Sequence, residues 1–250
     1  MTLQGKHALV TGGGTGIGLA IAQALAAQGA EVTITGRRLE VLQSVSGKGL
    51  HALQMDVAEE ASIVEGTAAA VAARGPVQIC VANAGIAEGK TMQKTDLEFW
   101  QKIMRTNLDG AFLTVRESLK SMLTTDWGRV ITVSSIAGLR GLKGAGAYSA
   151  SKHGVIGLMR TYSEEYMGTP FTFNSLCPGY VETDIVTRQM ASIAARTGQT
   201  EDEARAYMAS GNRHQKLLQP EEVSAAAMWL CGPGSQSISG QEIAISGGQV

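Results

Sequence analysis

The sequence is poor in cysteine and has no long uninterrupted hydrophobic run. Its three cysteines, Cys80, Cys177 and Cys231, lie far apart and show none of the spacings of a metal site or a disulfide framework. No stretch approaches the ~18 consecutive apolar residues that a membrane helix needs. The first residues also lack the basic and then apolar pattern of a secretory signal. These absences predict a soluble protein of the reducing cytoplasm that holds no metal.

An excess of charge of either sign is missing as well. Lys and Arg number 21 against 22 Asp and Glu, which gives a formal net charge of -1. Without a global positive field the chain is expected to bind neither nucleic acid nor an anionic membrane. The expected partners are a small-molecule substrate and copies of the chain itself. A length of 250 residues suits one large core, so residues 1–250 are interpreted as a single domain.

Short hydrophobic segments alternate with longer segments of helical period along the chain. Strands are predicted near residues 7–10, 32–35, 50–55, 77–81, 130–133, 171–176 and 242–245. Strands that alternate with helices are joined by crossover connections, which produce a mostly parallel sheet covered on both faces. The predicted fold is therefore an α/β, doubly wound, seven-stranded sheet of the Rossmann type, flanked by helices.

One long segment breaks this alternation. Residues 180–219 are polar and helix-prone and lie between the sixth strand and the next helix, so they are interpreted as an inserted lid. Apolar side chains recur in the lid at roughly helical intervals, namely Ile185, Val186, Met190, Ile193 and Met208. This pattern predicts either a hydrophobic wall of a substrate pocket or a small core that belongs to the lid itself.

A glycine-rich turn follows the first strand directly. Residues 11–18 read TGGGTGIG and lead into a helix. Glycines let the backbone turn sharply and approach a ligand, and a helix N-terminus offers unpaired N–H groups and the positive end of a dipole. Gly12, Thr15, Gly16 and Ile17 are therefore predicted to bind the pyrophosphate of a dinucleotide. The alternative is a tight connection without a ligand.

The end of the second strand carries arginine. Many NAD enzymes place an acidic residue there, on the ribose hydroxyls, whereas this chain has Gly36-Arg37-Arg38. A guanidinium at Arg37 suits a 2′-phosphate, so NADP(H) is the favoured cofactor and NAD(H) the other candidate. Alternatively, both arginines only solvate a surface loop.

A tyrosine and a lysine share one face of a predicted helix. Tyr148 and Lys152 are four residues apart, which places them one helical turn from each other. A free tyrosine has a pKa of about 10, so it needs a nearby positive charge to act as a base at neutral pH. Lys152 is predicted to supply that charge and to lower the pKa of Tyr148. Ser134 and Ser135 follow the fifth strand, at the sheet edge where such folds bind ligands.

These residues together resemble the short-chain dehydrogenases/reductases over essentially the whole chain. The matching marks are Thr11-Gly12-x-x-x-Gly16-Ile17-Gly18, Asn83-Ala84-Gly85, Asn107, Ser135, Tyr148-x-x-x-Lys152, and Pro178-Gly179 followed by Thr183. The resemblance implies a nicotinamide-dependent enzyme that interconverts a secondary alcohol and a ketone. It also implies a homotetramer, with interfaces at the helices around Asn107 and Tyr148 and at the last strand.

The resemblance assigns a role to each of these residues. Ser135 would orient the substrate carbonyl, Tyr148 would donate its proton, and Lys152 would bind the nicotinamide ribose. Asn107, in a kinked helix, would hold a water that relays protons. The further cofactor contacts would be Asp56 and Val57 at the adenine, Asn83, Ala84 and Gly85 along the adenosine, and Pro178, Gly179 and Thr183 at the nicotinamide. Alternatively, Asp56 caps a helix and Asn83 only joins neighbouring strands.

The substrate is predicted from side chains that are missing. The lid resembles that of bacterial 3-hydroxybutyrate dehydrogenases, but those enzymes clamp a carboxylate with a glutamine, a histidine and a lysine. The corresponding regions here hold Ile86 and Ala87, Ile136 and Ala137, and Ala145. A 3-oxoacyl or 3-hydroxyacyl thioester, or a hydrophobic ketone, is therefore favoured over free hydroxybutyrate. A catalytically inactive cofactor-binding scaffold or redox sensor is the alternative from another class.

Overall fold

A parallel sheet forms the centre of the protein. The computed structural model describes residues 2–184, 186–187, 190–191, 194, 198 and 200–250. The seven strands lie in the order β3-β2-β1-β4-β5-β6-β7, and all six pairings are parallel. The strands are β1 (His7–Thr11), β2 (Glu31–Gly36), β3 (Leu50–Gln54), β4 (Val77–Ala82), β5 (Gly128–Val133), β6 (Phe171–Pro178) and β7 (Glu242–Ile245). The predicted doubly wound fold is confirmed, with a fully parallel sheet.

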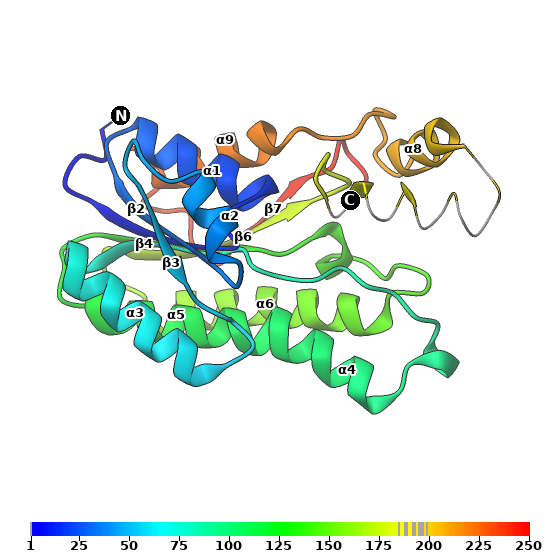
Figure 1. Ribbon diagram of the computed structural model, residues 1–250. Coiled ribbons are helices and arrows are strands. Elements are labelled where there is room, and N and C mark those ends of the chain that lie inside the picture. Colours follow the sequence, from blue (N-terminus) through cyan, green and yellow to red (C-terminus); the bar gives the residue numbers. More distant parts are fainter. Residues whose placement is uncertain (1, 185, 188–189, 192–193, 195–197, 199) are drawn as a thin grey trace.

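Helices cover both faces of the sheet (Figure 1). The α-helices are α1 (Gly16–Ala27), α2 (Leu39–Ser44), α3 (Glu60–Arg74), α4 (Leu97–Met104), α5 (Gly110–Met122), α6 (Gly146–Glu165), α8 (Glu201–Ala209) and α9 (Pro220–Cys231). Two 3-10 turns, η1 (Met92–Lys94) and η3 (Ile136–Gly138), and a π-helical segment, η2 (Arg105–Asp109), complete the described elements. Helix α6 begins at Gly146, slightly before the predicted start at Tyr148.

Two hydrophobic cores result from the pleat of the strands. Ala8 and Val10 of β1 face one core, which also contains residues of α1 and α9, whereas Leu9 faces the other core, with residues of α3, α5 and α6. Successive side chains of a strand point to opposite faces, so a strand covered on both faces is apolar throughout. The continuous hydrophobic runs in the sequence reflect this double burial.

The strand order determines where a ligand can bind. The chain proceeds outward from β1 to β3 and then crosses back to β4 on the other side of β1. The connections after β1 and β4 therefore leave the sheet in opposite directions, and they open a crevice at the carboxyl edge. Ligands of open α/β sheets bind at this switch point.

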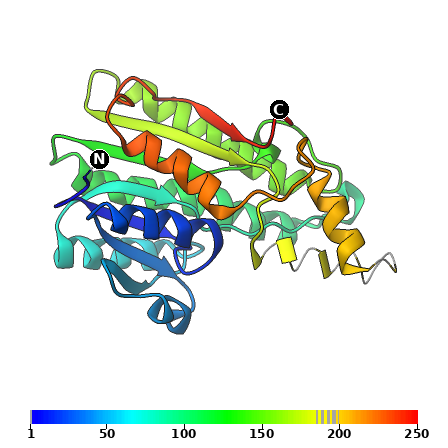
Figure 2. The same cartoon turned by 90° about the horizontal axis from the view of Figure 1, so that it is seen from above.

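The predicted lid emerges from the same edge, and Figure 2 shows α8 projecting beyond the sheet. Val181 and Leu218 form a parallel bridge where the lid leaves and rejoins the domain. Val186, Met208, Ala209 and Leu217 form a separate cluster of buried side chains, against which Met190 packs. The lid thus has a small core of its own, as the alternative interpretation expected. Ile185 and Ile193 lie outside the described residues.

None of the described helices combines the length and apolar character required to cross a membrane. Among the described residues there is also no group of His, Cys, Asp and Glu side chains able to hold a metal ion.

Candidate active site

The glycine-rich turn is shaped for close approach of a ligand. Gly12 and Gly16 have φ values of +64° and +53°, a region that side chains with a Cβ rarely adopt. A Cβ at Gly12 would lie 2.8 Å from Asn83 Nδ2. Thr15 is the N-cap residue of α1, yet its side chain makes no capping hydrogen bond. The first N–H groups of α1 and the Thr15 hydroxyl therefore face the crevice without a capping partner in the described structure.

Asn83 and Asp56 both make local structural bonds. Asn83 Nδ2 donates to Thr11 O at 2.8 Å, and Asn83 N donates to Thr11 Oγ1 at 3.0 Å, so this residue joins the ends of β1 and β4 as the alternative expected. Asp56 Oδ1 accepts a hydrogen bond from Ala58 N at 3.0 Å and closes a short turn before α3. Both residues still line the crevice.

Two arginines extend from the end of β2. Arg37 and Arg38 are exposed and line the crevice, and neither forms an ion pair within the described part of the chain. The Arg37 backbone is held by Gln54 Nε2, which donates to Arg37 O at 2.9 Å. Their guanidinium groups are thus available to a phosphate.

Ser135, Tyr148 and Lys152 meet at the carboxyl end of β5. Ser135 is the N-cap residue of η3, and its Oγ accepts a hydrogen bond from Ala137 N at 3.1 Å. The Ser135 side chain also lies close enough to the Tyr148 phenol to favour a lower pKa of Tyr148. Lys152 lies one turn further along α6; its Nζ donates to Val133 O at 2.8 Å and lies 5.7 Å from the centre of the Tyr148 ring. The structure therefore brings together the three side chains that the sequence predicted to cooperate.

The pKa of Tyr148 departs from the sequence prediction. Burial raises the pKa of Tyr148 above its usual value, and Ser135 opposes this only in part. Burial also lowers the pKa of Lys152 to about 8. The expected net lowering of the Tyr148 pKa is thus wrong for this structure, because burial, which favours the neutral phenol, outweighs the opposing contribution of Ser135.

Asn107 lies in the predicted kink but outside the lining of the crevice. It belongs to the π-helical segment η2 and is buried. Its Oδ1 accepts a hydrogen bond from Ile86 N at 2.8 Å, while Nδ2 donates to Ile86 O at 2.9 Å and to Ser151 Oγ at 3.2 Å. The side chain therefore holds the segment after β4 against α6, and its polar atoms are already occupied by the protein.

A single crevice of about 1000 Å³ connects these groups. Every predicted catalytic and cofactor residue except Asn107 lines it, including the residues of the glycine turn, Tyr148 and Thr183. A dinucleotide suits this shape, because the glycine backbone, the helix N–H groups and Arg37 would be placed to meet its phosphates while its reacting end would reach Tyr148.

Several residues that line the crevice were not predicted from the sequence. Tyr180 at the start of the lid, and Leu142 and Lys143 before α6, contribute to the crevice. The only sequence signal for Tyr180 was its position directly after Pro178-Gly179. Glu98, Gln101 and Lys102 of α4 also line the crevice, although no motif marks them.

Comparisons with known proteins agree with this geometry. The family model for short chain dehydrogenases matches residues 6–194. The chain belongs to this family. It is 34% identical to a D-beta-hydroxybutyrate dehydrogenase of Rhizobium meliloti, over 97% of this chain and 98% of the relative. It is 32% identical to the 3-oxoacyl-[acyl-carrier-protein] reductase FabG of Aquifex aeolicus, over 98% of each chain.

A solved structure has the same fold. A tryptophan-substituted variant of actinorhodin polyketide ketoreductase, solved with NADPH, superposes with a TM-score of 0.94 at 32% identity, covering 100% of this chain and 99% of its own. Family membership makes this short-chain dehydrogenase an NAD(P)-dependent oxidoreductase acting on CH–OH groups.

Proposed function

We propose that this short-chain dehydrogenase interconverts a 3-oxoacyl and a 3-hydroxyacyl thioester, or a comparably bulky hydrophobic ketone and its alcohol, with NADP(H). The observation that carries the proposal is a set of apolar side chains near Tyr148, although Lys143 also lines the crevice between Leu142 and Ala145. Ile86, Ile136, Leu142 and Ala145 line the crevice there, at or near the positions where a hydroxybutyrate enzyme holds its carboxylate. An apolar wall favours a substrate without a free carboxylate, because burying an unpaired charge is costly.

In the reduction direction the proposal gives each side chain one task. Ser135 donates a hydrogen bond to the substrate carbonyl oxygen, and Tyr148 transfers its phenolic proton to the same oxygen. The bound nicotinamide supplies the hydride to the carbonyl carbon. The resulting phenolate is stabilised by the Lys152 ammonium and recovers its proton from solvent. Positioning and one proton are the protein's main contributions.

The cofactor preference rests on Arg37 and Arg38. Two exposed guanidinium groups at the end of β2 offer bidentate hydrogen bonds to a 2′-phosphate. An acidic residue is absent from this position. The related ketoreductase was solved with NADPH, which supports the same choice here.

A substrate and cofactor matrix tests the proposed function. The wild-type protein would be assayed with acetoacetyl thioesters, bulky ketones and free 3-hydroxybutyrate, each with phosphorylated and non-phosphorylated cofactor. Thioesters or bulky ketones with NADPH should give the highest kcat/KM. Strong activity on free 3-hydroxybutyrate with none on thioesters or ketones would favour the hydroxybutyrate alternative. Tight NADPH binding without oxidation by any carbonyl would favour the inactive scaffold.

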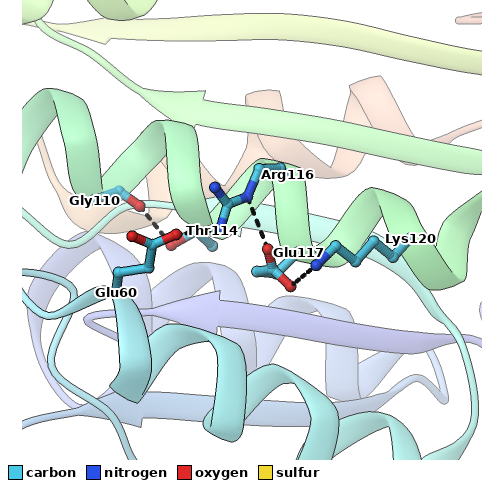
Figure 3. A network of polar contacts seen from close by, with 6 residues as sticks. All are labelled: Glu60, Gly110, Thr114, Arg116, Glu117 and Lys120. Carbon is cyan, nitrogen blue, oxygen red and sulfur yellow. Dashed lines mark hydrogen bonds and ion pairs between the residues drawn. The ribbon is translucent and has the colours of Figure 1, made fainter.

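We also propose a homotetramer in the cytoplasm. The outer surface of α5 supports self-association, since Phe112 is 37% exposed there and Arg116 Cζ lies 5.6 Å from the centre of its ring. Next to it the nearly buried Glu117 carboxylate binds Arg116 at 2.8 Å and Lys120 at 2.6 Å (Figure 3). All three cysteines are free and buried, which suits a reducing compartment. Analytical ultracentrifugation tests the proposed assembly. At micromolar concentration the protein should sediment with the mass of a tetramer, and sedimentation as a monomer would contradict the homotetramer.

A further inference from the structure

Asn212 is a fully buried amide at the point where the lid rejoins the domain. Its Oδ1 accepts a hydrogen bond from Tyr180 N at 3.0 Å, and its Nδ2 donates to Tyr180 O at 3.0 Å and to Lys216 O at 2.7 Å. One side chain therefore binds both backbone groups of a single residue, as a neighbouring strand would. We call residues 180–182 and 212–218 the lid neck.

The rest of the lid neck is built around this contact. Leu218 N donates to Tyr180 O at 2.9 Å, and Glu182 N donates to Leu218 O at 2.8 Å. A Cβ at Gly179 would overlap Asn212 Oδ1, so the Pro178-Gly179 turn can approach the amide only because residue 179 is glycine. The position of Tyr180 is thus specified by a residue 32 positions away in sequence.

Tyr180 lies between the lid cluster and the crevice. Its ring packs against the lid cluster of Val186, Met208, Ala209 and Leu217, and it also lines the crevice. The phenol lies close enough to Tyr148 to contribute to the raised pKa of that residue. A shift of the Tyr180 backbone would therefore move a wall of the crevice next to the reacting group.

We propose that Asn212 is a positioning residue for substrate selection, which fixes Tyr180 as the lid-side wall of the crevice. An asparagine suits this task because its amide carries both a donor and an acceptor. Alanine at this position would leave the partly buried Tyr180 N–H without its hydrogen-bond acceptor. The free-energy cost of that unpaired group favours a shift of the lid neck that brings the N–H to another acceptor. The inference rests on the proposed function, because its readout is the binding of the carbonyl substrate.

Asn212→Ala tests the proposal, with Asn174→Ala as the matched control. Asn174 is equally buried, donates from Nδ2 to Ile238 O at 2.7 Å and accepts from Gln241 N at 3.1 Å, but does not line the crevice. Asn212→Ala should raise the KM of the carbonyl substrate about 10-fold, because small misplacements at a binding wall are costly. Its dissociation constant for NADPH should change less than the KM does, since the glycine turn and Arg37 belong to other elements and only Pro178, Gly179 and Thr183 of the predicted cofactor contacts adjoin the lid neck. Asn174→Ala should lower Tm without changing either constant.

A double-mutant cycle separates positioning from general damage. If Asn212 acts through Tyr180, Asn212→Ala should have no further effect on the substrate KM in a Tyr180→Ala background. Additive effects of the two substitutions would overturn the proposal, as would a wild-type KM in Asn212→Ala. An inactive wild-type protein would instead refute the proposed function. The two failures are therefore distinguishable.

Discussion

Lys152 is an ammonium group with little water around it. Only 5% of the residue is exposed, its Nζ donates to Val133 O, and burial lowers its pKa to about 8. The same burial keeps Tyr148 protonated at neutral pH. A protonated phenol next to an ammonium group suits donation of a proton to a carbonyl, which is the reduction direction.

The Lys152 pKa predicts a pH dependence for reduction. A lowered pKa means that Lys152 loses its charge as the pH rises through about 8, so stabilisation of the Tyr148 phenolate should be lost over that interval. The kcat/KM for ketone reduction should therefore fall above about pH 8. Lys152→Arg stays charged in this range, so its kcat/KM should not fall above about pH 8. Its kcat/KM should be lower than that of wild type at every pH, because a guanidinium does not replace an ammonium group in position. A wild-type profile that stays flat to about pH 10, the ordinary range of a lysine, would contradict the assignment.

Arg37 predicts a selective change in cofactor binding. Because its guanidinium is exposed at the crevice, Arg37→Ala should raise the KM for NADPH at least about 10-fold, as expected for a lost charge-assisted pair. The KM for NADH should change less than about 2-fold, because that cofactor has no 2′-phosphate. Arg74→Ala, at the far end of α3, is the matched control. Equal losses with both cofactors would show that Arg37 does not read the 2′-phosphate.

At the scale of elements, the turn after β1 could be predicted from the sequence, because its backbone conformation depends only on residues within the turn. Positive φ values and close backbone approach demand glycine at Gly12 and Gly16. The segment around Asn107 shows the opposite case. Its motif marked a functional position, but only the structure shows that its amide spans from η2 to Ile86 and Ser151.

Asn107→Ala should therefore destabilise the protein as well as affect activity. The substitution leaves Ile86 N and Ile86 O without their side-chain partner, a cost of about 2 kcal/mol for buried polar groups. Urea denaturation monitored by circular dichroism would measure it. Asn174→Ala, which also removes two backbone contacts, should be of similar size but should leave kcat unchanged. An Asn107→Ala protein of wild-type stability would contradict this structural role.

At the scale of the whole molecule, sequence patterns located all seven strands, whereas the strand order and the switch point between β1 and β4 come from the structure. Each strand is a local hydrophobic run, and parallel order follows from the alternation with helices. The lid was harder to interpret. Val186 and Met208 recur at helical intervals, but periodicity could not tell whether their partners were a substrate or each other. The Asn212–Tyr180 contact has no sequence signature, because its partners are distant in the chain.

The direction of the Tyr148 pKa shift was also not predictable from the sequence. An i, i+4 pair predicts proximity, which the structure confirms, but the direction of a pKa shift depends on burial by residues from several elements. Side-chain identity alone contains no information on that burial.

The central claim is that Tyr148 protonates a carbonyl that is held next to apolar side chains of the crevice. Its most direct test is the rate of NADPH oxidation with an acetoacetyl thioester and a bulky ketone, compared between wild type and Tyr148→Phe. The wild type should be active, and Tyr148→Phe, which removes only the proton donor, should lose at least about 100-fold in kcat while its dissociation constant for NADPH stays within about 2-fold. Tyr148→Phe activity close to that of wild type, or wild-type activity confined to free 3-hydroxybutyrate, would contradict the account.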